Sequence, residues 1–592
     1  MADGEDEAVG EMSDGLQVEL FHPDSDREPG DTNIQRFGFD VHPVVFPVAL
    51  LIIAVFVAAT ILFQESMSDL YDWAFSFVNT TFGWFYILAI NLFIITIIYF
   101  AFSKYGNIKI GGVEAEKEFS DFSWMAMLFS AGMGIGLMFF SVPEPMGYFQ
   151  GPPAIFGAEA GTGAAAQAAL AQTFFHWGFS PWAVYGLVGL GLAFFSFNRG
   201  LPLTFRSIFW PLLGERIYGW LGHLIDLVTV FATLFGLCTS LGLGVAQVNT
   251  GMWYVAGDVL NLGTIPTGTI PQVALIAGIT AIATLSVAAG LDGGVKRLST
   301  LNLYLMLALL GFLLVVGPTL FIFGAWLEGI GTYFQNFLAL TFFTGTLGTG
   351  EAGSVGSGTV ATTVFYWGWW IAWSPFVGMF IARISKGRTV REFVLGVLFL
   401  PALFSFLWMS TFGGSAIALE LASSGQGPVA TAMAGDNGGT IAMFAMLNQF
   451  PLGAVTGILA TLLVITFFVT SSDSGSLVID HLTSGGKHDV PKVQRIFWAV
   501  TEGIVAAMLL LGGGLGALRT ASVSTGLPFA AILVLMCYTV YKGLKNEYEI
   551  LESEEFAETI EELTAEEDVD VVTAGDEMVT DITEGDEAAG GD

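Results

Sequence analysis

The chain has 592 residues, of which 54% are hydrophobic and 12% are charged, and it carries a formal net charge of −33 at pH 7. Together with a mean hydropathy of +0.68, this composition excludes a soluble globular protein of this size and predicts an all-α polytopic membrane protein. The two cysteines, Cys238 and Cys537, fall in apolar stretches, so we expect neither a disulfide framework nor a metal site built on them.

Most of the negative charge lies at the two ends of the chain. Residues 1–40 hold 12 acidic and 2 basic residues, and residues 543–592 hold 19 acidic and 1 basic residue. Segments this acidic and poor in aromatic residues bury too little apolar surface to fold. We therefore expect disordered tails at 1–41 and 543–592 around a membrane domain at 42–542, and we favour a solvating over a regulatory role for them. The pI of about 4.3 is typical of a halophile, whose salt-rich cytosol screens surface charge.

Apolar stretches of about 18 residues or more predict membrane-spanning helices. Twelve such stretches occur near residues 44–64, 84–103, 122–148, 168–197, 222–255, 272–291, 302–325, 360–384, 391–412, 440–471, 494–516 and 524–542. Lys and Arg residues between the stretches fall in or beside the even-numbered loops, and only Arg519 lies in an odd-numbered one. Because basic loops stay on the cytoplasmic side, we expect a multi-pass protein of the plasma membrane with both termini in the cytoplasm.

Glycines interrupt the third stretch, where Gly132, Gly134 and Gly136 occupy alternate positions. Each weakens a helix by about 1 kcal/mol relative to alanine. An unwound helix persists in a membrane where it lines a protein-enclosed cavity, ion site or substrate site. Close packing of neighbouring helices through small residues explains the same spacing equally well.

The fourth stretch carries three aromatic residues, Trp177, Trp182 and Tyr185. At helical spacing they fall within about 140° of one another. Packing against lipid or other helices is the ordinary role of such residues in membranes. They could instead form one wall of a cage for a cation.

The eighth stretch has four tryptophans within seven residues. At about 100° per residue, Trp369, Trp370 and Trp373 share one stripe of the helix, apart from Trp367. The following Ser374-Pro375 pair predicts an interruption of this helix. Two interrupted helices five spans apart indicate inverted repeats at about 120–325 and 360–542, with the site between them near the bilayer midplane.

The tenth stretch ends in a run of hydroxyl residues from Thr466 to Ser476. Hydroxyl and carbonyl oxygens are hard ligands that suit a small cation. Serine and threonine also bond back to helix carbonyls as ordinary structure. Asp473 within the run is expected to cap or pair near the cytoplasmic face.

Several of these segments resemble the betaine/choline/carnitine transporter family. The resemblance is carried by the glycine run continuing into Ser141-Val142-Pro143-Glu144-Pro145, by His176-Trp177-Gly178, and above all by the segment from Trp367 to Arg391. It covers nearly all of residues 44–542. It implies secondary active uptake of a quaternary ammonium solute on a twelve-helix fold with a 5+5 inverted-repeat (LeuT-like) core, often as a homotrimer in the lipid bilayer. No nucleic-acid partner is expected.

The resemblance also implies site residues. The substrate would lie in an aromatic box of Trp177, Trp182, Tyr185 and Trp370, with Trp369 and Trp373 along the route and Gly132, Gly134 and Gly136 beside it. Sodium, the expected coupling ion, would bind Ser130, Met133, Phe467, Thr470 and Ser471. A possible second sodium site would use Thr233 and Phe376, although Leu237 stands where that site would have a further threonine.

The resemblance implies that choline-selective, proton-coupled members of the family carry aspartate at the position of Gly136. This chain has no carboxylate there, which favours a zwitterionic solute over a bare cation. We therefore expect sodium-driven import of glycine betaine as an osmoprotecting compatible solute. The alternatives are a sodium-independent exchanger or proton-coupled carrier of carnitine or choline, and a sensor or channel that binds a quaternary amine without pumping it. No stretch pairs an acid with a base as an enzyme would require, and no cofactor other than the sodium ion is expected.

Overall fold

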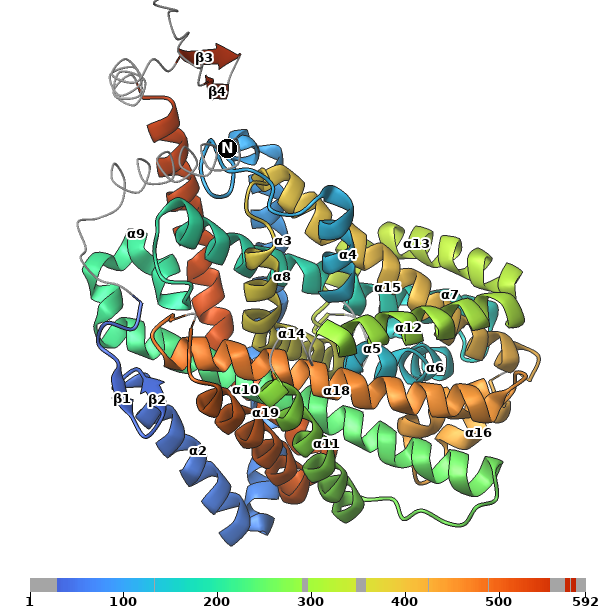
Figure 1. Ribbon diagram of the computed structural model, residues 1–592. Coiled ribbons are helices and arrows are strands. Elements are labelled where there is room, and N and C mark those ends of the chain that lie inside the picture. The colour runs from blue at the N-terminus through green and yellow to red at the C-terminus, as the bar shows by residue number, and fades with distance from the viewer. Residues whose placement is uncertain are drawn as a thin grey trace, which may run out of the picture.

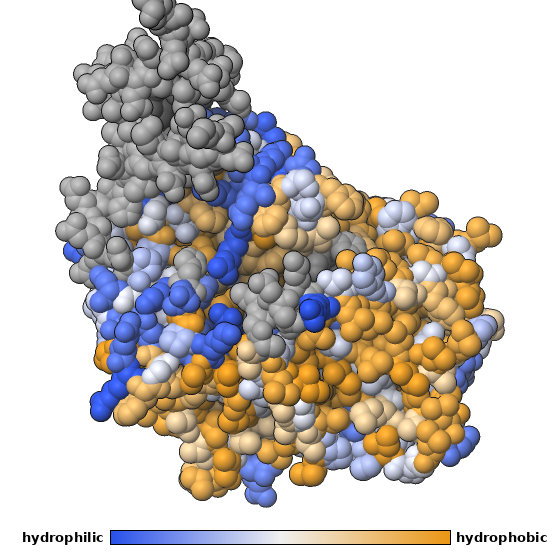
Figure 2. Space-filling view, in the orientation of Figure 1, coloured by the Kyte–Doolittle hydropathy of each residue, from blue (hydrophilic) through white to orange (hydrophobic). Residues whose placement is uncertain are grey.

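The computed structural model describes residues 29–131, 134–289, 296–347, 358–423, 425–487, 489–553, 570–574 and 577–581. Within these ranges the membrane domain is all-α (Figure 1). Figure 2 shows hydrophobic side chains over most of the visible face, with hydrophilic ones gathered on the side where the N-terminal strands lie. This surface is that of a multi-pass membrane protein.

Nine helices in the described part of the chain are long and apolar enough to cross a membrane. They are α2 (Val45–Leu62), α3 (Gln64–Phe102), α7 with α8 (Gly163–Trp177 and Phe179–Ala193), α10 (Trp220–Trp253), α11 (Thr269–Ala289), α12 (Lys296–Val316), α15 (Val390–Leu421), α18 (Gly453–Thr483) and α19 (Lys492–Leu551). Two predicted stretches, 494–516 and 524–542, both lie in α19, which kinks at Gly513 and Gly514. The count of twelve spans and the inverted repeat stay predictions.

The remaining helices are shorter or less apolar. They are α4 (Asp121–Ala131), α5 (Ile135–Phe140), α6 (Pro143–Gln150), α9 (Trp210–Leu213), α13 (Thr319–Thr341), α14 (Gly358–Arg383), α16 (Pro428–Met433) and α17 (Ala442–Leu447). Two predicted boundaries were wrong. The stretch 302–325 straddles the end of α12 and the start of α13, and 440–471 begins in the separate helix α17.

The glycine run breaks the third stretch as predicted. Helix α4 ends at Ala131 and α5 begins at Ile135, and Gly134 between them is extended, with φ −170° and ψ −173°. Gly132 and Met133 lie outside the described residues. The break leaves backbone groups of the α5 N-terminus without helical partners, which is the condition for a binding site inside a membrane protein.

The interruption predicted at Ser374-Pro375 was wrong, because α14 is one continuous helix with Pro375 inside it. A proline cannot donate to the carbonyl four residues earlier, here that of Ile371. The Ser374 hydroxyl donates to this same carbonyl at 2.8 Å. Side-chain compensation of this kind is what allows a proline to stay within a membrane helix.

The fourth stretch, predicted as one helix over 168–197, is instead divided at Gly178. This residue is non-helical (φ −97°, ψ −129°) and separates α7 from α8. A Cβ atom on Gly178 would lie 2.6 Å from the carbonyl oxygen of Phe174 and 2.7 Å from the ring of Phe406. Glycine is therefore required by close packing, and the last carbonyls of α7 are left available to other donors.

The ends of the membrane domain extend further than predicted. Strands β1 (Ile34–Arg36) and β2 (Phe39–Val41) pair antiparallel within the segment expected to be a disordered tail. The hairpin docks on the loop after α18, where the backbone N–H of His42 donates to the Thr483 carbonyl at 2.8 Å and Lys487 pairs with Asp40 at 2.6 Å. At the other end α19 continues to Leu551, and β3 (Asp570–Ala574) pairs with β4 (Glu577–Asp581).

His42 also shapes the start of α2. Its Nδ1 accepts the backbone N–H groups of Val44 and Val45 at 3.2 Å each. Burial, with a smaller contribution from the nearby Arg206 charge, lowers the pKa of His42 to about 3. The imidazole therefore stays neutral at physiological pH and keeps an acceptor for the helix N-terminus.

The basic loops contact one another on one side of the molecule. The backbone N–H of Gly387 donates to the Ile110 carbonyl at 2.8 Å, and that of Gly111 donates to Asn198 Oδ1 at 2.8 Å. Arg388 pairs with Asp121 at 2.8 Å. Three of the even-numbered loops, the second, fourth and eighth, thus lie together, as the predicted topology requires of them. The placement of the other even-numbered loops and the assignment of this face to the cytoplasm stay predictions.

Candidate binding site

A small cavity of about 30 Å³ lies where the broken third stretch meets α8 and α14. It is lined by Gly134, Gly136, Leu137, Trp177, Pro181, Trp182, Tyr185, Ser240, Trp369, Trp370, Trp373 and Ser405. We call it the aromatic cavity. All six aromatic residues predicted for the substrate site line it.

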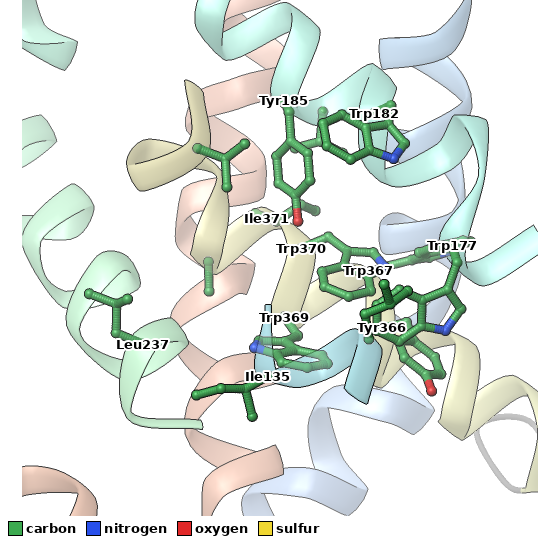
Figure 3. Close-up of a cluster of buried hydrophobic side chains, with 14 of the residues drawn as sticks. Ile135, Trp177, Trp182, Tyr185, Leu237, Tyr366, Trp367, Trp369, Trp370 and Ile371 are labelled. Atoms are coloured by element: carbon green, nitrogen blue, oxygen red, sulfur yellow. The ribbon is translucent and has the colours of Figure 1, made fainter. Parts of the chain in front are cut away.

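The rings around this cavity come from helices that are distant in sequence (Figure 3). The centroids of Trp177 and Trp370 lie 4.9 Å apart at 74°, and those of Trp182 and Tyr185 lie 5.3 Å apart at 81°. Trp369 stacks on Trp370 at 4.7 Å. In the close-up the hydroxyl of Tyr185 points toward Trp370. Such an arrangement presents several ring faces to one small volume.

Three of the indoles are held by their N–H edges. Trp370 Nε1 donates at 3.0 Å to the His176 carbonyl near the C-terminal end of α7. Trp369 Nε1 lies 3.3 Å from both the Gly236 carbonyl and the Ser240 hydroxyl, and Trp177 Nε1 donates to the Glu144 carboxylate at 2.7 Å. These bonds fix the orientation of the three indoles, two of which, Trp369 and Trp370, also stack on each other. A cation would bind to the negative face of a ring that lines the cavity.

Two polar groups at the cavity have no partner. The Tyr185 hydroxyl and the Trp373 Nε1–H are buried and make no hydrogen bond with any residue in the described ranges. A buried donor without a partner costs free energy, of the order of 1–3 kcal/mol. Both groups can donate to an anionic end of a bound molecule.

Gly136 sets the size of the cavity. A Cβ atom there would lie 2.6 Å from Trp369 Cη2 and 3.1 Å from Trp177 Cη2. The tips of two rigid indoles would have to move to admit any side chain at this position. Gly134 also lines the cavity, and Gly132 falls outside the described residues.

A second cavity of about 320 Å³ lies between α12, α14 and α18. We call it the hydroxyl cavity. It is lined by Ser299, Asn302, Leu303, Met306, Trp373, Phe376, Val377, Met379, Phe380, Arg383, Phe467, Thr470, Ser471, Ser474, Leu477 and Val478. Trp373 belongs to both cavities and separates them.

The residues predicted to bind sodium are partly brought together here. Phe467, Thr470 and Ser471 line the hydroxyl cavity, and the Thr470 hydroxyl lies 3.1 Å from the Thr466 carbonyl and 3.2 Å from Asn302 Nδ2. Met133 lies outside the described residues, and Ser130 is described only as part of α4. The geometry therefore assembles the α18 half of the predicted site.

The second predicted sodium site is less well supported. Phe376 lines the hydroxyl cavity, whereas Thr233 is not among its lining residues and donates its hydroxyl to the Thr229 carbonyl at 2.7 Å. Leu237 packs against Gly475, where a Cβ atom would lie 2.2 Å from its methyl carbon. The apolar side chain of Leu237 therefore occupies the position at which the second sodium site would need a further oxygen ligand.

Asp473 lies inside α18 and is buried, and its carboxylate accepts the Ser286 hydroxyl of α11 at 3.0 Å. It pairs across two helices, and it does not cap one. Sequence reasoning missed a second buried carboxylate, Glu144, which sits against Trp177, His176 and Tyr366. An acidic residue within an apolar stretch is itself a signal of function, and Glu144 occurs in the motif on which the family resemblance rests.

A multi-pass helical fold with an aromatic cavity between its helices is the arrangement expected of a solute carrier in a membrane. The chain matches the betaine/carnitine/choline family transporter model over residues 44–549 and belongs to that family.

Two relatives from Vibrio parahaemolyticus are similar over nearly the whole chain. A glycine betaine transporter 1 is 46% identical over 543 residues, which covers 90% of this chain and 99% of the relative. A glycine betaine/proline/choline transporter is 43% identical over 542 residues, covering 88% and 94%. A glycine betaine transporter of Acinetobacter baylyi is 41% identical over 510 residues, covering 86% and 74%.

Proposed function

We propose that this protein imports glycine betaine by secondary active transport driven by a sodium gradient. The observation that carries the proposal is the aromatic cavity, in which six aromatic residues from three helices surround one small volume. A trimethylammonium group has no N–H to donate, and aromatic faces bind it with about 0.5–2 kcal/mol per contact. The relatives at 41–46% identity are named as transporters of glycine betaine, in agreement with this substrate.

A zwitterion also needs donors for its carboxylate. The Tyr185 hydroxyl and Trp373 Nε1–H are buried and unpartnered among the described residues, and they line the same cavity. The backbone break before Ile135 adds N–H groups at a helix N-terminus, which favours an anion. The absence of a side chain at Gly136 leaves the site without a competing carboxylate.

Sodium would bind beside the hydroxyl cavity, between the broken third stretch, whose helix α5 contacts α18, and α18 itself. The proposed ligands are Thr470 and Ser471 with backbone oxygens of Phe467, Ser130 and Met133, since hydroxyl and carbonyl oxygens suit this ion. Coupling follows if the ion holds the broken helix against α18 while the solute is bound. A second sodium at Thr233 and Phe376 is not part of the proposal, because Leu237 fills that position.

The proposal includes the arrangement of the whole molecule. Twelve spans with inverted repeats at about 120–325 and 360–542 would form each protomer of a homotrimer in the plasma membrane, with both termini in the cytoplasm. Cross-linking of the purified protein in detergent and in vesicles tests the trimer. Protease accessibility of the N-terminal segment in oriented vesicles tests the orientation.

The function is tested with the purified full-length chain in proteoliposomes. We expect radiolabelled glycine betaine to accumulate above its external concentration when an inward sodium gradient is imposed, and to leave again when the gradient is collapsed. Equal accumulation with a potassium gradient would contradict sodium coupling. Equilibration without accumulation under every gradient would indicate a channel, and no specific uptake would contradict transport of this solute.

A further inference from the structure

One buried carboxylate, Glu144, lies behind the aromatic cavity and is not among its lining residues. It occupies the second position of α6, just beyond the broken helix. Its Oε1 accepts from His176 Nδ1 at 2.6 Å, and its Oε2 accepts from Trp177 Nε1 at 2.7 Å and from the Tyr366 hydroxyl at 2.5 Å. One carboxylate thus joins three segments, α6, α7 and α14, by charge-assisted hydrogen bonds.

The partner histidine is held from its other side as well. His176 Nε2 lies 2.9 Å from Thr363 Oγ1 of α14 and 3.1 Å from Gln172 Nε2 of α7. The Tyr366 ring stacks on the imidazole with centroids 4.5 Å apart. Every polar atom of the imidazole and of the Glu144 carboxylate has a partner, so this cluster can hold one fixed geometry inside the membrane.

Two indoles of the aromatic cavity depend on this cluster. Trp177 donates its only N–H to Glu144, and Trp370 donates its N–H to the backbone carbonyl of His176. These are the two rings that contact each other at the cavity wall, with centroids 4.9 Å apart. Glu144 therefore holds the N–H edge of Trp177 directly. It also holds His176, whose backbone carbonyl accepts the N–H of Trp370.

The position of the cluster along α14 separates it from the hydroxyl cavity. Tyr366 lies about one turn and Thr363 about two turns before Trp370. The α14 residues that line the hydroxyl cavity beyond Trp373 fall between Phe376 and Arg383. At about 1.5 Å per residue, the cluster, the aromatic cavity and the hydroxyl cavity follow one another along the same helix. Along α14, the cluster therefore lies on the other side of the aromatic cavity from the hydroxyl cavity.

We propose that Glu144 is a positioning residue for solute binding: it orients the Trp177 indole and holds α6 and α7 against α14, so that the ring faces meet the quaternary ammonium group. This inference rests on the proposed function of the aromatic cavity. The solute does not touch Glu144, and the carboxylate acts through the indole.

The test compares glycine betaine affinity and thermal stability of full-length variants in detergent. Glu144→Gln keeps the size of the side chain but replaces one carboxylate oxygen by an NH2 group, which donates. Because Trp177 and His176 donate to different oxygens of Glu144, at most one of these two contacts survives unchanged. We expect the dissociation constant for glycine betaine to rise on the order of tenfold. Glu144→Asp shortens the side chain by one methylene, keeps the charge, and is expected to fall between wild type and Glu144→Gln.

Glu420→Gln is the matched control. Glu420 is also a fully buried carboxylate that accepts N–H groups, those of Val429 at 2.9 Å and Ala430 at 3.3 Å, but it contacts no residue of the aromatic cavity's ring set. We expect this control to lower the melting temperature without changing the dissociation constant. An equal loss of affinity in Glu420→Gln would show that Glu144 acts only through general stability.

A double-mutant cycle separates positioning from an independent effect. Trp177→Phe keeps a ring at the cavity but removes the N–H that Glu144 accepts. If Glu144 acts through this indole, Glu144→Gln should cost much less in the Trp177→Phe background than in wild type. Additive losses, or unchanged affinity in a folded Glu144→Gln or Glu144→Asp protein, would overturn the proposal. Failure of wild type itself to bind glycine betaine would instead overturn the proposed function.

Discussion

The two cavities along α14 share Trp373 but are built from different kinds of side chain. The aromatic cavity is bounded by large rings whose N–H groups are mostly bonded to other helices, and its volume is about 30 Å³. The hydroxyl cavity is bounded by serine, threonine and asparagine together with aliphatic residues, methionines, three phenylalanines, Trp373 and Arg383, and its volume is about 320 Å³. One is narrow, and the other is wide.

The difference in volume shows what binding requires of each region. About 10–15 Å³ of such space holds one water molecule, so the aromatic cavity has room for about two and must expand to admit glycine betaine. The hydroxyl cavity needs no expansion to hold a solute or hydrated ion. Under the proposed function, recognition and passage would use separate regions, with Trp373 as the boundary between them.

The largest expected effect comes from placing a charge in the narrow cavity. Gly136→Asp adds a carboxylate next to Trp369 and Trp177, where even a Cβ atom lies at 2.6 and 3.1 Å. We expect glycine betaine binding to weaken by at least about a hundredfold, ~3 kcal/mol, because a second buried carboxylate opposes that of the solute. Competition binding of glycine betaine and choline measures it, and choline should lose much less.

Gly136→Ala is the control for that variant, since it adds volume without charge. If alanine and aspartate reduce the binding of both solutes equally, the effect is steric and Gly136 does not select against cations. A larger loss for glycine betaine than for choline in the aspartate variant alone supports selection by charge.

The next effect removes a ring face from the aromatic cavity. Trp370→Leu should weaken glycine betaine binding by about 1–2 kcal/mol, or roughly 5- to 30-fold, the contribution of one desolvated cation–π contact. Isothermal titration of the purified protein measures it. Trp408→Leu is a suitable control, because Trp408 is buried against Phe412 in α15 and does not line the cavity. Unchanged affinity in a folded Trp370→Leu protein would remove this residue from the site.

Sequence patterns predicted the parts of the site that depend on local spacing. The glycine run marked the break before Ile135, and helical periodicity placed Trp369, Trp370 and Trp373 on one side of α14. Both features are properties of a single helix, so neighbouring residues in the sequence are sufficient to reveal them.

Features that depend on side-chain compensation within a helix, or on contacts between distant helices, were missed or predicted wrongly. Pro375 was taken to interrupt α14, but the Ser374 hydroxyl compensates for the missing N–H. Gly178 divides the fourth stretch because Phe406 of α15 approaches it. Glu144 acquires its partners from α7 and α14, more than 30 residues away in the sequence. A single sequence carries no record of which helices meet.

The hydroxyl cavity is tested through its oxygen atoms. Thr470→Val and Ser471→Ala each remove one hydroxyl from the cavity wall while nearly preserving the shape of the side chain. Because one proposed sodium ligand is lost, we expect the sodium concentration for half-maximal uptake to rise about five- to tenfold. The affinity for glycine betaine at saturating sodium should stay unchanged. Uptake measured over a range of sodium concentrations checks this.

Thr466→Val is the matched control for the sodium variants. Thr466 lies one turn earlier on α18, its hydroxyl bonds to the Leu462 and Leu463 carbonyls at 3.0 Å each, and it is not a lining residue of the cavity. An equal shift in Thr466→Val would mean that the threonine hydroxyls act by supporting α18, and an unchanged sodium response in all three variants would place the ion elsewhere.

The smallest effect is expected at the boundary between the cavities. Trp373→Phe keeps a ring but removes the buried Nε1–H, which has no partner among the described residues. If this group donates to the solute carboxylate, glycine betaine affinity should fall about threefold, the net value of one hydrogen bond, while choline, which lacks a carboxylate, should be unaffected. Trp367→Phe provides the control, because Trp367 packs on Phe175 outside the cavity. Equal losses for both solutes would mean that Trp373 contributes its ring face and not its N–H, and would make the boundary residue part of the cation site.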